Sequence, residues 1–188
     1  MAEGVWLVTG VQAAGKSTVA ELLAREFERG VHVRGGQFYR WAVRGWVHPG
    51  DERAAEARRL LDLRYRLAGL AAEEYCRAGF CTVVQDNIFG TDVRHWLETV
   101  AARPRHLVVL RPSLAVVRQR EQQRKDAIGK LAYRPGWFSP EDLDGFLAET
   151  PRIGLWLDTS ALTAGQTVRE ILSRRAEAVV DDTIAVSG

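Results

Sequence analysis

The sequence predicts an α/β fold in which helices cover both faces of a parallel β-sheet. Five short apolar runs have the character of strands and alternate with helical patterns, at residues 4–9, 31–33, 81–85, 106–110 and 153–157. Strands that alternate with helices are typical of a parallel sheet, because each helix returns the chain to the start of the next strand. A glycine-rich segment directly after the first strand supports the same fold class.

The glycine-rich segment reads GVQAAGKS over residues 10–17 and matches the pattern G-x-x-x-x-G-K-[ST] at every fixed position. It is followed by a helix whose apolar residues share one face: Val19, Leu22, Leu23 and Phe27. A loop between a strand and a helix can turn successive backbone N–H groups inward, and the positive end of the helix adds to their attraction for phosphate. We therefore expect a nucleoside-triphosphate site here.

Each fixed position of this pattern has a physical role in such a site. Gly10 and Gly15 stand where the backbone bends sharply or approaches the phosphates closely. Lys16 is expected to reach the β- and γ-phosphates, and the Ser17 hydroxyl is expected to bind Mg²⁺. The expected cofactors are ATP and Mg²⁺. The residues expected to bind the nucleotide are Gly10, Gln12, Ala13, Ala14, Gly15, Lys16, Ser17 and Thr18.

The later helices are predicted from apolar faces and capping residues. A long amphipathic helix is expected over residues 51–78, with an apolar face made of Leu60, Leu63, Leu67, Leu70 and Ala71. Thr91 is expected to cap the next helix. Ser139, followed by a proline, is expected to cap another. Thr163 and Gln166 form a capping box for the last helix.

Length and composition indicate one domain. We expect it to span residues 1–178, followed by a short tail over residues 179–188. With 26 basic and 24 acidic residues, the net charge of +2 gives no large field for nucleic acid. No apolar run has the length of a membrane span, and the N-terminus enters a strand without signal features. A cytoplasmic protein without nucleic-acid or membrane partners is therefore expected.

A basic helix and an irregular segment follow the fourth strand. Residues 125–139 show no clear periodicity, and we expect either a lid over the nucleotide or a plain surface loop. Arg120 and Arg124 are neighbours on one helix face and could neutralise charge on the transferred phosphoryl group. A solvated face paired with acids explains them equally. Lys125 and Arg134 are weaker candidates for the same role.

Other candidates for chemistry lie near strand ends. Asp86 follows the strand at 81–85, where a carboxylate can hold Mg²⁺ through water, orient an acceptor or accept its proton. A turn cap is the alternative. The four histidines share no metal-ligand spacing and are expected to be structural. One group of aromatic residues either lines an apolar pocket or packs in the core: Phe38, Tyr39, Trp41 and Trp46.

The chain resembles the small P-loop kinases, and among them the antibiotic phosphotransferases of the chloramphenicol phosphotransferase-like and tunicamycin-resistance-like types. The resemblance covers about residues 4–175 and rests on GVQAAGKST, HVRGGQFYR, LRYRLA, AGFCTVVQDNIFG, VVLRPSLAVVRQREQQR and TPRIGLWLDTS. It implies a nucleotide-kinase-like P-loop fold with a small lid, a sheet ordered 2-3-1-4-5 and an active site at the carboxyl ends of the strands. It also implies that residues 158–160 border the adenine, although a strand-end turn explains them equally.

The sequence departs from this family at one position that matters for chemistry. Relatives carry an aspartate in the loop after the second strand, where it accepts the proton of the acceptor hydroxyl. Here residues 33–37 read VRGGQ, and Gly36 stands in place of that carboxylate. Arg40 stands where relatives have a substrate-side arginine.

Together these observations predict an ATP- and Mg²⁺-dependent phosphotransferase acting on a hydroxyl of a small molecule, such as an antibiotic or a nucleoside-like metabolite. Its catalytic residues are expected to be Lys16, Asp86, Arg120 and Arg124. Two alternatives stay open. One is a nucleoside or nucleotide kinase. The other is a nucleotide-binding module that has lost phosphate transfer because Gly36 replaces the aspartate.

Overall fold

The computed structural model describes residues 4–48, 51–129, 133 and 137–180. A five-stranded sheet runs through its centre, made of β1 (Val5–Gly10), β2 (Gly30–Arg34), β3 (Cys81–Gln85), β4 (Arg105–Leu110) and β5 (Leu155–Leu157). The order is β2-β3-β1-β4-β5, and all four neighbouring pairs are parallel. Both the fold class and the expected strand order are confirmed.

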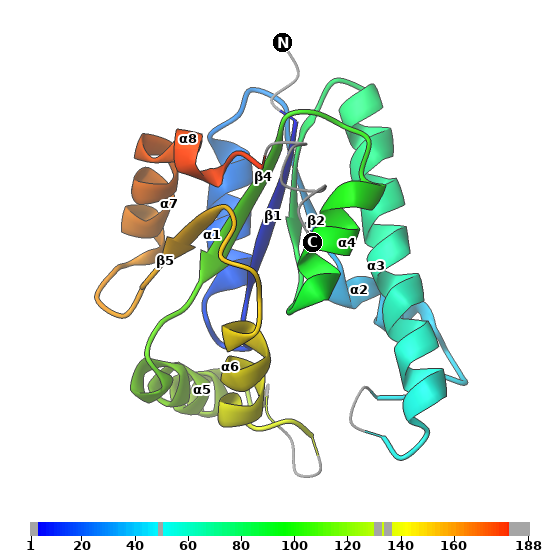
Figure 1. Ribbon diagram of the computed structural model, residues 1–188. Coiled ribbons are helices and arrows are strands. Elements are labelled where there is room, and N and C mark those ends of the chain that lie inside the picture. The colour runs from blue at the N-terminus through cyan, green and yellow to red at the C-terminus, as the bar shows by residue number, and fades with distance from the viewer. Residues whose placement is uncertain (1–3, 49–50, 130–132, 134–136, 181–188) are drawn as a thin grey trace.

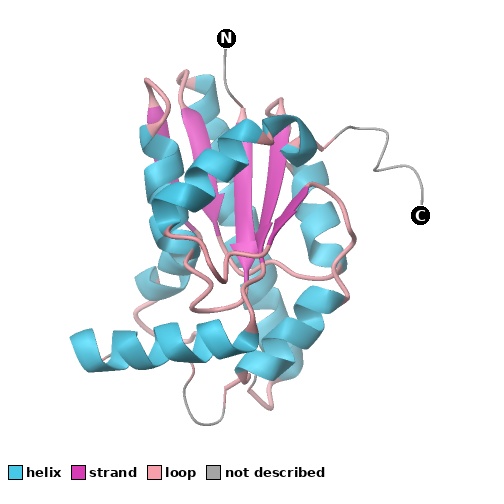
Figure 2. Cartoon of the chain, turned by 90° about the vertical axis from the view of Figure 1, so that its left-hand side faces the viewer, coloured by secondary structure: helices cyan, strands magenta, loops and turns pink. Residues whose placement is uncertain are grey.

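The helices form two layers around the sheet, and two further helices lie beyond its end. The helices are α1 (Lys16–Arg25), α2 (Gly36–Trp41), α3 (Ala54–Arg77), α4 (Thr91–Thr99), α5 (Leu114–Ile128), α6 (Pro140–Ala148), α7 (Ala164–Ser173) and α8 (Arg175–Ala178). Figure 1 shows α1, α7 and α8 on one face and α3 and α4 on the other. Figure 2 shows α5 lying across the carboxyl ends of the strands.

Side-chain caps mark the starts of three helices, α5, α6 and α7. Ser139 and Thr163 form capping boxes with Asp142 and Gln166, as their spacing predicts. The expectation for Thr91 is wrong by one residue, because Gly90 is the N-cap and Thr91 is the first helical residue. Gly90 has a φ of 57°, which glycine adopts without the penalty that a side chain would add.

The buried face of α3 differs from the predicted leucine face. It is made mainly of small residues: Ala57, Tyr65, Ala68, Gly69 and Ala72. Leu63 and Leu70 are instead 37% and 51% exposed. A Cβ on Gly69 would lie 3.5 Å from a methyl of Val100 and 3.6 Å from Trp96, so α3 and its neighbours approach too closely for leucines there. Close packing, which apolar periodicity does not report, decides the face.

The end of the described chain joins the sheet. Val179 forms an antiparallel bridge with His106, and the Val180 N–H donates to the Arg105 carbonyl over 2.9 Å. The first two residues of the expected tail are therefore held against β4, whereas residues 181–188 lie outside the described part of the chain. None of the helices within the described ranges has both the length and the apolar character required for a bilayer crossing.

The turn from β2 into α2 contains two adjacent glycines in different surroundings. A Cβ on Gly35 would lie 2.0 Å from Oδ2 of Asp86, whereas a Cβ on Gly36 would meet nothing within 4 Å. Neither glycine requires a left-handed backbone. The two positions therefore differ in the space that is available for a side chain.

We predict that Gly35→Ala lowers the free energy of unfolding by about 1–3 kcal/mol, because the added methyl must displace a buried carboxylate. Gly36→Ala is the matched control, and it should leave that free energy unchanged or raise it by up to about 1 kcal/mol. Urea unfolding of both variants beside the wild type measures the difference. Equal midpoints for the two variants would contradict the close contact at Gly35.

Candidate active site

The loop between β1 and α1 lies at the carboxyl end of the central strand. It needs three left-handed or unusual backbone positions, with φ of 142° at Gly10, 60° at Ala13 and 95° at Gly15. A Cβ at Gly10 would lie only 2.3 Å from the Leu110 carbonyl oxygen, so the neighbouring strand excludes a side chain there. The loop runs directly into the first turn of α1, whose N–H groups have no helical partner. This is the geometry expected of a phosphate-binding loop.

The Lys16 side chain is held inside this loop. It is buried, and its Nζ donates a hydrogen bond of 2.6 Å to the Val11 carbonyl. Burial first, and then the charges of Arg64 and Arg124, lower the pKa of Lys16 to about 7. An anion placed beside Nζ would favour the charged form of the lysine again. Lys16 is therefore arranged to gain its full charge when phosphate groups enter.

A cavity of about 830 Å³ opens beside the loop, and we call it the phosphate cavity. Its lining includes most of the residues expected to bind the nucleotide: Gln12, Ala13, Gly15, Lys16, Ser17 and Thr18. Gly10 and Ala14 are buried beneath the loop and shape it. Gly36 and Arg40, the expected acceptor-side residues, line the same cavity.

The phosphate cavity is strongly cationic. Its charged lining residues are Lys16, Arg34, Arg40, Arg64, Arg120 and Arg124. No aspartate or glutamate lines it among the residues that the structure describes. A concave site of one charge sign attracts a polyanion and offsets the charge of its phosphates.

The two candidate arginines of α5 both line the phosphate cavity but have different surroundings. Arg120 donates from Nη1 to the Ala14 carbonyl over 3.1 Å and from Nη2 to the Thr159 carbonyl over 2.9 Å. It therefore joins the phosphate loop to the segment after β5. Arg124 is exposed, and it lies near enough to Lys16 to lower the pKa of that lysine.

Much of the expected lid lies outside the described residues, namely 130–132 and 134–136, which include the candidate Arg134. Tyr133 is described, and its hydroxyl donates to the Gln12 carbonyl over 2.8 Å. Its backbone N–H donates to Glu121 over 3.0 Å. Lys125 is exposed on α5, away from the lining of both cavities described here. Whether this segment opens and closes stays a prediction.

Asp86 is completely buried and forms an ion pair with Arg64. Arg64 Nε donates to Asp86 Oδ2 over 3.0 Å, and its Nη2 contacts Oδ1. The Asn87 N–H also donates to Oδ1, over 2.7 Å. Both carboxylate oxygens are thus engaged, and the Arg64 guanidinium, rather than Asp86, faces the cavities. Sequence reasoning missed Arg64, because its partner lies 22 residues away in the chain.

The predicted metal role of Ser17 fits its surroundings. The Ser17 hydroxyl donates to Gln85 Oε1 over 3.0 Å, so two uncharged oxygens stand together at the ends of α1 and β3. Oxygen ligands suit Mg²⁺, which keeps several of its own water molecules. Ser17 could therefore bind the ion directly and Gln85 through water. When bound, Mg²⁺ would offset negative charge on the β- and γ-phosphates.

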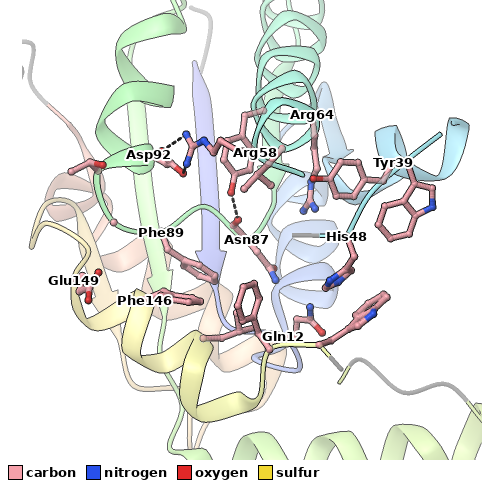
Figure 3. A pocket seen from close by; sticks show the side chains of 18 residues that line it. Gln12, Tyr39, His48, Arg58, Arg64, Asn87, Phe89, Asp92, Phe146 and Glu149 are labelled. Carbon is pink, nitrogen blue, oxygen red and sulfur yellow. Dashed lines mark hydrogen bonds and ion pairs between the residues drawn. The ribbon is translucent and has the colours of Figure 1, made fainter. Parts of the chain in front are cut away.

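A second cavity of about 550 Å³ adjoins the first, and we call it the aromatic cavity. Figure 3 shows its lining side chains converging from α2, α3, α6 and the segment before α4. Eight of its eighteen lining residues carry rings: Tyr39, Trp46, His48, Tyr65, Phe89, Trp137, Phe138 and Phe146. The two cavities share five lining residues, Gln12, Trp46, Arg64, Asn87 and Trp137, and therefore meet.

The predicted aromatic group divides between the two roles. Tyr39 and Trp46 line the aromatic cavity, with their rings stacked at 5.5 Å. Phe38 packs against the core, and Trp41 is 69% exposed. His48, for which a structural role was expected, lines the aromatic cavity, and its ring centroid stacks 3.6 Å from that of Trp137.

Polar contacts fix the remaining wall of the aromatic cavity. Arg58 donates two hydrogen bonds of 2.8 Å to the Asp92 carboxylate, and the Tyr65 hydroxyl donates to the Asn87 carbonyl over 2.7 Å (Figure 3).

In the segment 158–160, the Ser160 N–H donates to Asp158 over 2.8 Å. This is the strand-end turn that was one of the two explanations for that segment.

We predict that Asp86→Asn lowers the free energy of unfolding by about 3–5 kcal/mol, because it leaves the Arg64 charge buried without its counter-ion. Arg64→Met should cost a similar amount. The double variant should lose much less than the sum, since neither charge is then left alone. Urea unfolding of the four proteins completes this cycle, and additive losses would show that the two side chains act independently.

A second prediction concerns Lys16 and pH. Since the pKa of Lys16 is about 7 without nucleotide and rises beside phosphate, binding of Mg²⁺–ATP at pH 8 should take up nearly one proton. Affinity should then fall as pH rises above 7. Calorimetry in buffers with different ionisation heats measures the uptake. Lys16→Arg keeps its charge at every pH and should abolish the uptake; uptake that persists in this variant would point to another group.

Comparison with known proteins agrees with this geometry. Residues 5–134, which contain the phosphate loop, match the family described as AAA domain (AAA_33). The fold is similar to a sugar kinase from Janibacter sp. HTCC2649, at 15% identity, 98% coverage of both chains and a TM-score of 0.63. Comparison with curated proteins gives no match.

Two further solved structures share the fold. A gluconokinase from Sinorhizobium meliloti 1021 has 18% identity, 94% coverage of both chains and a TM-score of 0.61. The tunicamycin resistance protein of Deinococcus radiodurans has 16% identity, covers 94% of this chain and 98% of its own, and has a TM-score of 0.61. Since the family match covers more than half of the sequence, the chain belongs to the AAA domain family AAA_33.

Proposed function

We propose that the protein is a kinase that transfers the γ-phosphate of ATP to a small molecule bound in the aromatic cavity. The observation that carries this proposal is the meeting of two unlike cavities at five shared residues. One is cationic and contains a phosphate-binding loop, and the other is walled by rings. A triphosphate in the first cavity would present its terminal phosphate to a molecule in the second.

The chain's own residues would supply positioning and charge. Lys16 and the loop N–H groups would hold the β- and γ-phosphates, with Mg²⁺ bound at Ser17. Arg64 stands where the cavities meet and would offset charge on the phosphoryl group in transit, held in place by Asp86. Arg120 would keep the loop in shape, and Arg124 would add charge from α5.

The aromatic walls favour an acceptor with a substantial apolar body. A polyol offers little apolar surface to such walls, whereas an antibiotic or a nucleoside-like compound carries rings that can stack on them. The sugar kinase and gluconokinase neighbours share the fold at identities of 15% and 18%, which carries no statement about the acceptor of this chain. We propose an antibiotic-like or nucleoside-like compound as the acceptor class.

The experiment is a transfer assay with radiolabelled ATP and a mixed library of nucleosides, sugars and antibiotics. Lys16→Ala should lower ATP affinity and transfer by about 10²–10³-fold, because it removes a positive charge beside the phosphates. Lys125→Ala is the matched control, since that lysine is exposed and lines neither cavity, and it should behave as the wild type.

Two results would oppose the proposal, in different ways. Wild-type ATP affinity in Lys16→Ala would contradict the assignment of the phosphate loop. Tight ATP binding by the wild type, with no acceptor in the library phosphorylated and none accelerating ADP release, would instead support a nucleotide-binding module without transfer.

A further inference from the structure

The place where the two cavities meet has an unusual charge for a kinase that activates an alcohol. The five residues shared by both cavities are Gln12, Trp46, Arg64, Asn87 and Trp137, and none of them carries a carboxylate. In the sequence, residues 49–50 and 130–136 contain no aspartate or glutamate either. Among the described residues, an acceptor oxygen at this point therefore faces the Arg64 guanidinium, two amides and two indole rings, without a carboxylate to take its proton.

The described carboxylates that line the aromatic cavity or bond to Arg64 are either paired or lie away from this place. Asp86 is buried, with both oxygens bonded to Arg64 and to the Asn87 N–H. Asp92 accepts two hydrogen bonds from Arg58. Glu149 lines the aromatic cavity, but Figure 3 shows it on the side away from Arg64 and Gln12.

Two other side chains could accept a proton in principle, and the structure argues against one of them. Burial raises the pKa of Tyr39, so its hydroxyl stays protonated at neutral pH. His48 lines the aromatic cavity, with its ring stacked on Trp137, but is not one of the residues shared with the phosphate cavity.

We infer that the acceptor is a phenol: an aromatic compound whose own hydroxyl ionises readily enough to need no protein base. This inference rests on the proposed kinase function and specifies its substrate class. The aromatic walls suit the ring, through stacked and edge-on contacts. The cations where the cavities meet suit the oxyanion.

The chemistry is consistent with this assignment. A phenol such as that of tyrosine has a pKa of about 10, so at pH 8 about 1% is already ionised. The pKa of an alcohol is closer to that of water, which is about 15.7, so transfer to an alcohol depends far more on a base. The phenol loses its proton to solvent, and the phenolate oxygen forms a bond to the γ-phosphorus. The bond from that phosphorus to the β–γ bridging oxygen breaks, and ADP leaves with its electron pair.

Gly36 supplies the means to reverse this preference. It lines the phosphate cavity, a Cβ there would meet nothing within 4 Å, and its backbone is not left-handed. Gly36→Asp should therefore fold normally and add a carboxylate to the phosphate cavity, which meets the aromatic cavity at Arg64. Gly145→Asp is the matched control, because Gly145 on α6 also has open space around its Cβ and lines neither cavity.

The experiment compares 7-hydroxycoumarin, a phenol, with 7-(hydroxymethyl)coumarin, its matched alcohol, at saturating Mg²⁺–ATP. A second pair, 2-naphthol and 2-naphthalenemethanol, tests whether the result depends on the coumarin ring system. The wild type and Gly145→Asp should phosphorylate the phenols at least tenfold faster than the alcohols. Gly36→Asp should raise transfer to the alcohols by about 10²-fold and change transfer to the phenols much less.

A pH series with fluorinated 7-hydroxycoumarins gives the independent readout. The rate with each compound should follow the ionisation of that compound's own phenol. A common inflection for all of them that disappears in His48→Gln would assign proton removal to His48 and overturn the inference. Faster transfer to the alcohols by the wild type would also overturn it, while leaving the kinase function standing. Transfer to neither class by any variant, despite ATP binding, would count against both.

Discussion

The ion pair between Asp86 and Arg64 is the interaction on which the candidate site depends. It joins the carboxyl end of β3 to the middle of α3, and both partners are largely withdrawn from water. Removal of two charges from water is costly, so the pair persists only because each carboxylate oxygen has a partner. The same carboxylate occupies the space beside Gly35 and thereby sets where the chain turns from β2 into α2.

That ion pair also determines which charge lines the two cavities. Asp86 is the acidic residue that follows β3, yet its oxygens are directed to Arg64, and the guanidinium lines both cavities. A position that was expected to present a carboxylate thus presents a cation, with the carboxylate behind it. Together with Gly36, which adds no carboxylate at the start of α2, this leaves the meeting point of the cavities cationic. The proposed preference for a phenol follows from that charge.

The phosphate loop and the arginines of α5 form one connected structure. Arg120 donates to the Ala14 carbonyl and to the Thr159 carbonyl, so the loop is tied to α5 and to the segment after β5. Tyr133 reaches the Gln12 carbonyl from the segment after α5. These bonds end on backbone carbonyls and so hold the shape of the loop, while Lys16 and Arg124 line the cavity that the loop borders.

The sequence by itself determined the features that depend on neighbours in the chain. The phosphate loop, the alternation of strands and helices, and the capping boxes at Ser139 and Thr163 rest on contacts within a few residues, which a local pattern records. The order of the strands was predicted through the resemblance to a family rather than from periodicity. The structure confirms it.

Only the tertiary structure decided the features that depend on residues far apart. The small-residue face of α3 is set by its close approach to Trp96 and Val100, which the spacing of leucines does not reveal. The fold also decides which surfaces meet. It pairs Arg64 with Asp86, and it places Tyr39 and Trp46 in the aromatic cavity while it leaves Trp41 exposed. A side chain's residue type fixes what it can bind, but its burial and partners fix what it does bind, and these arise only when the sheet and helices are assembled.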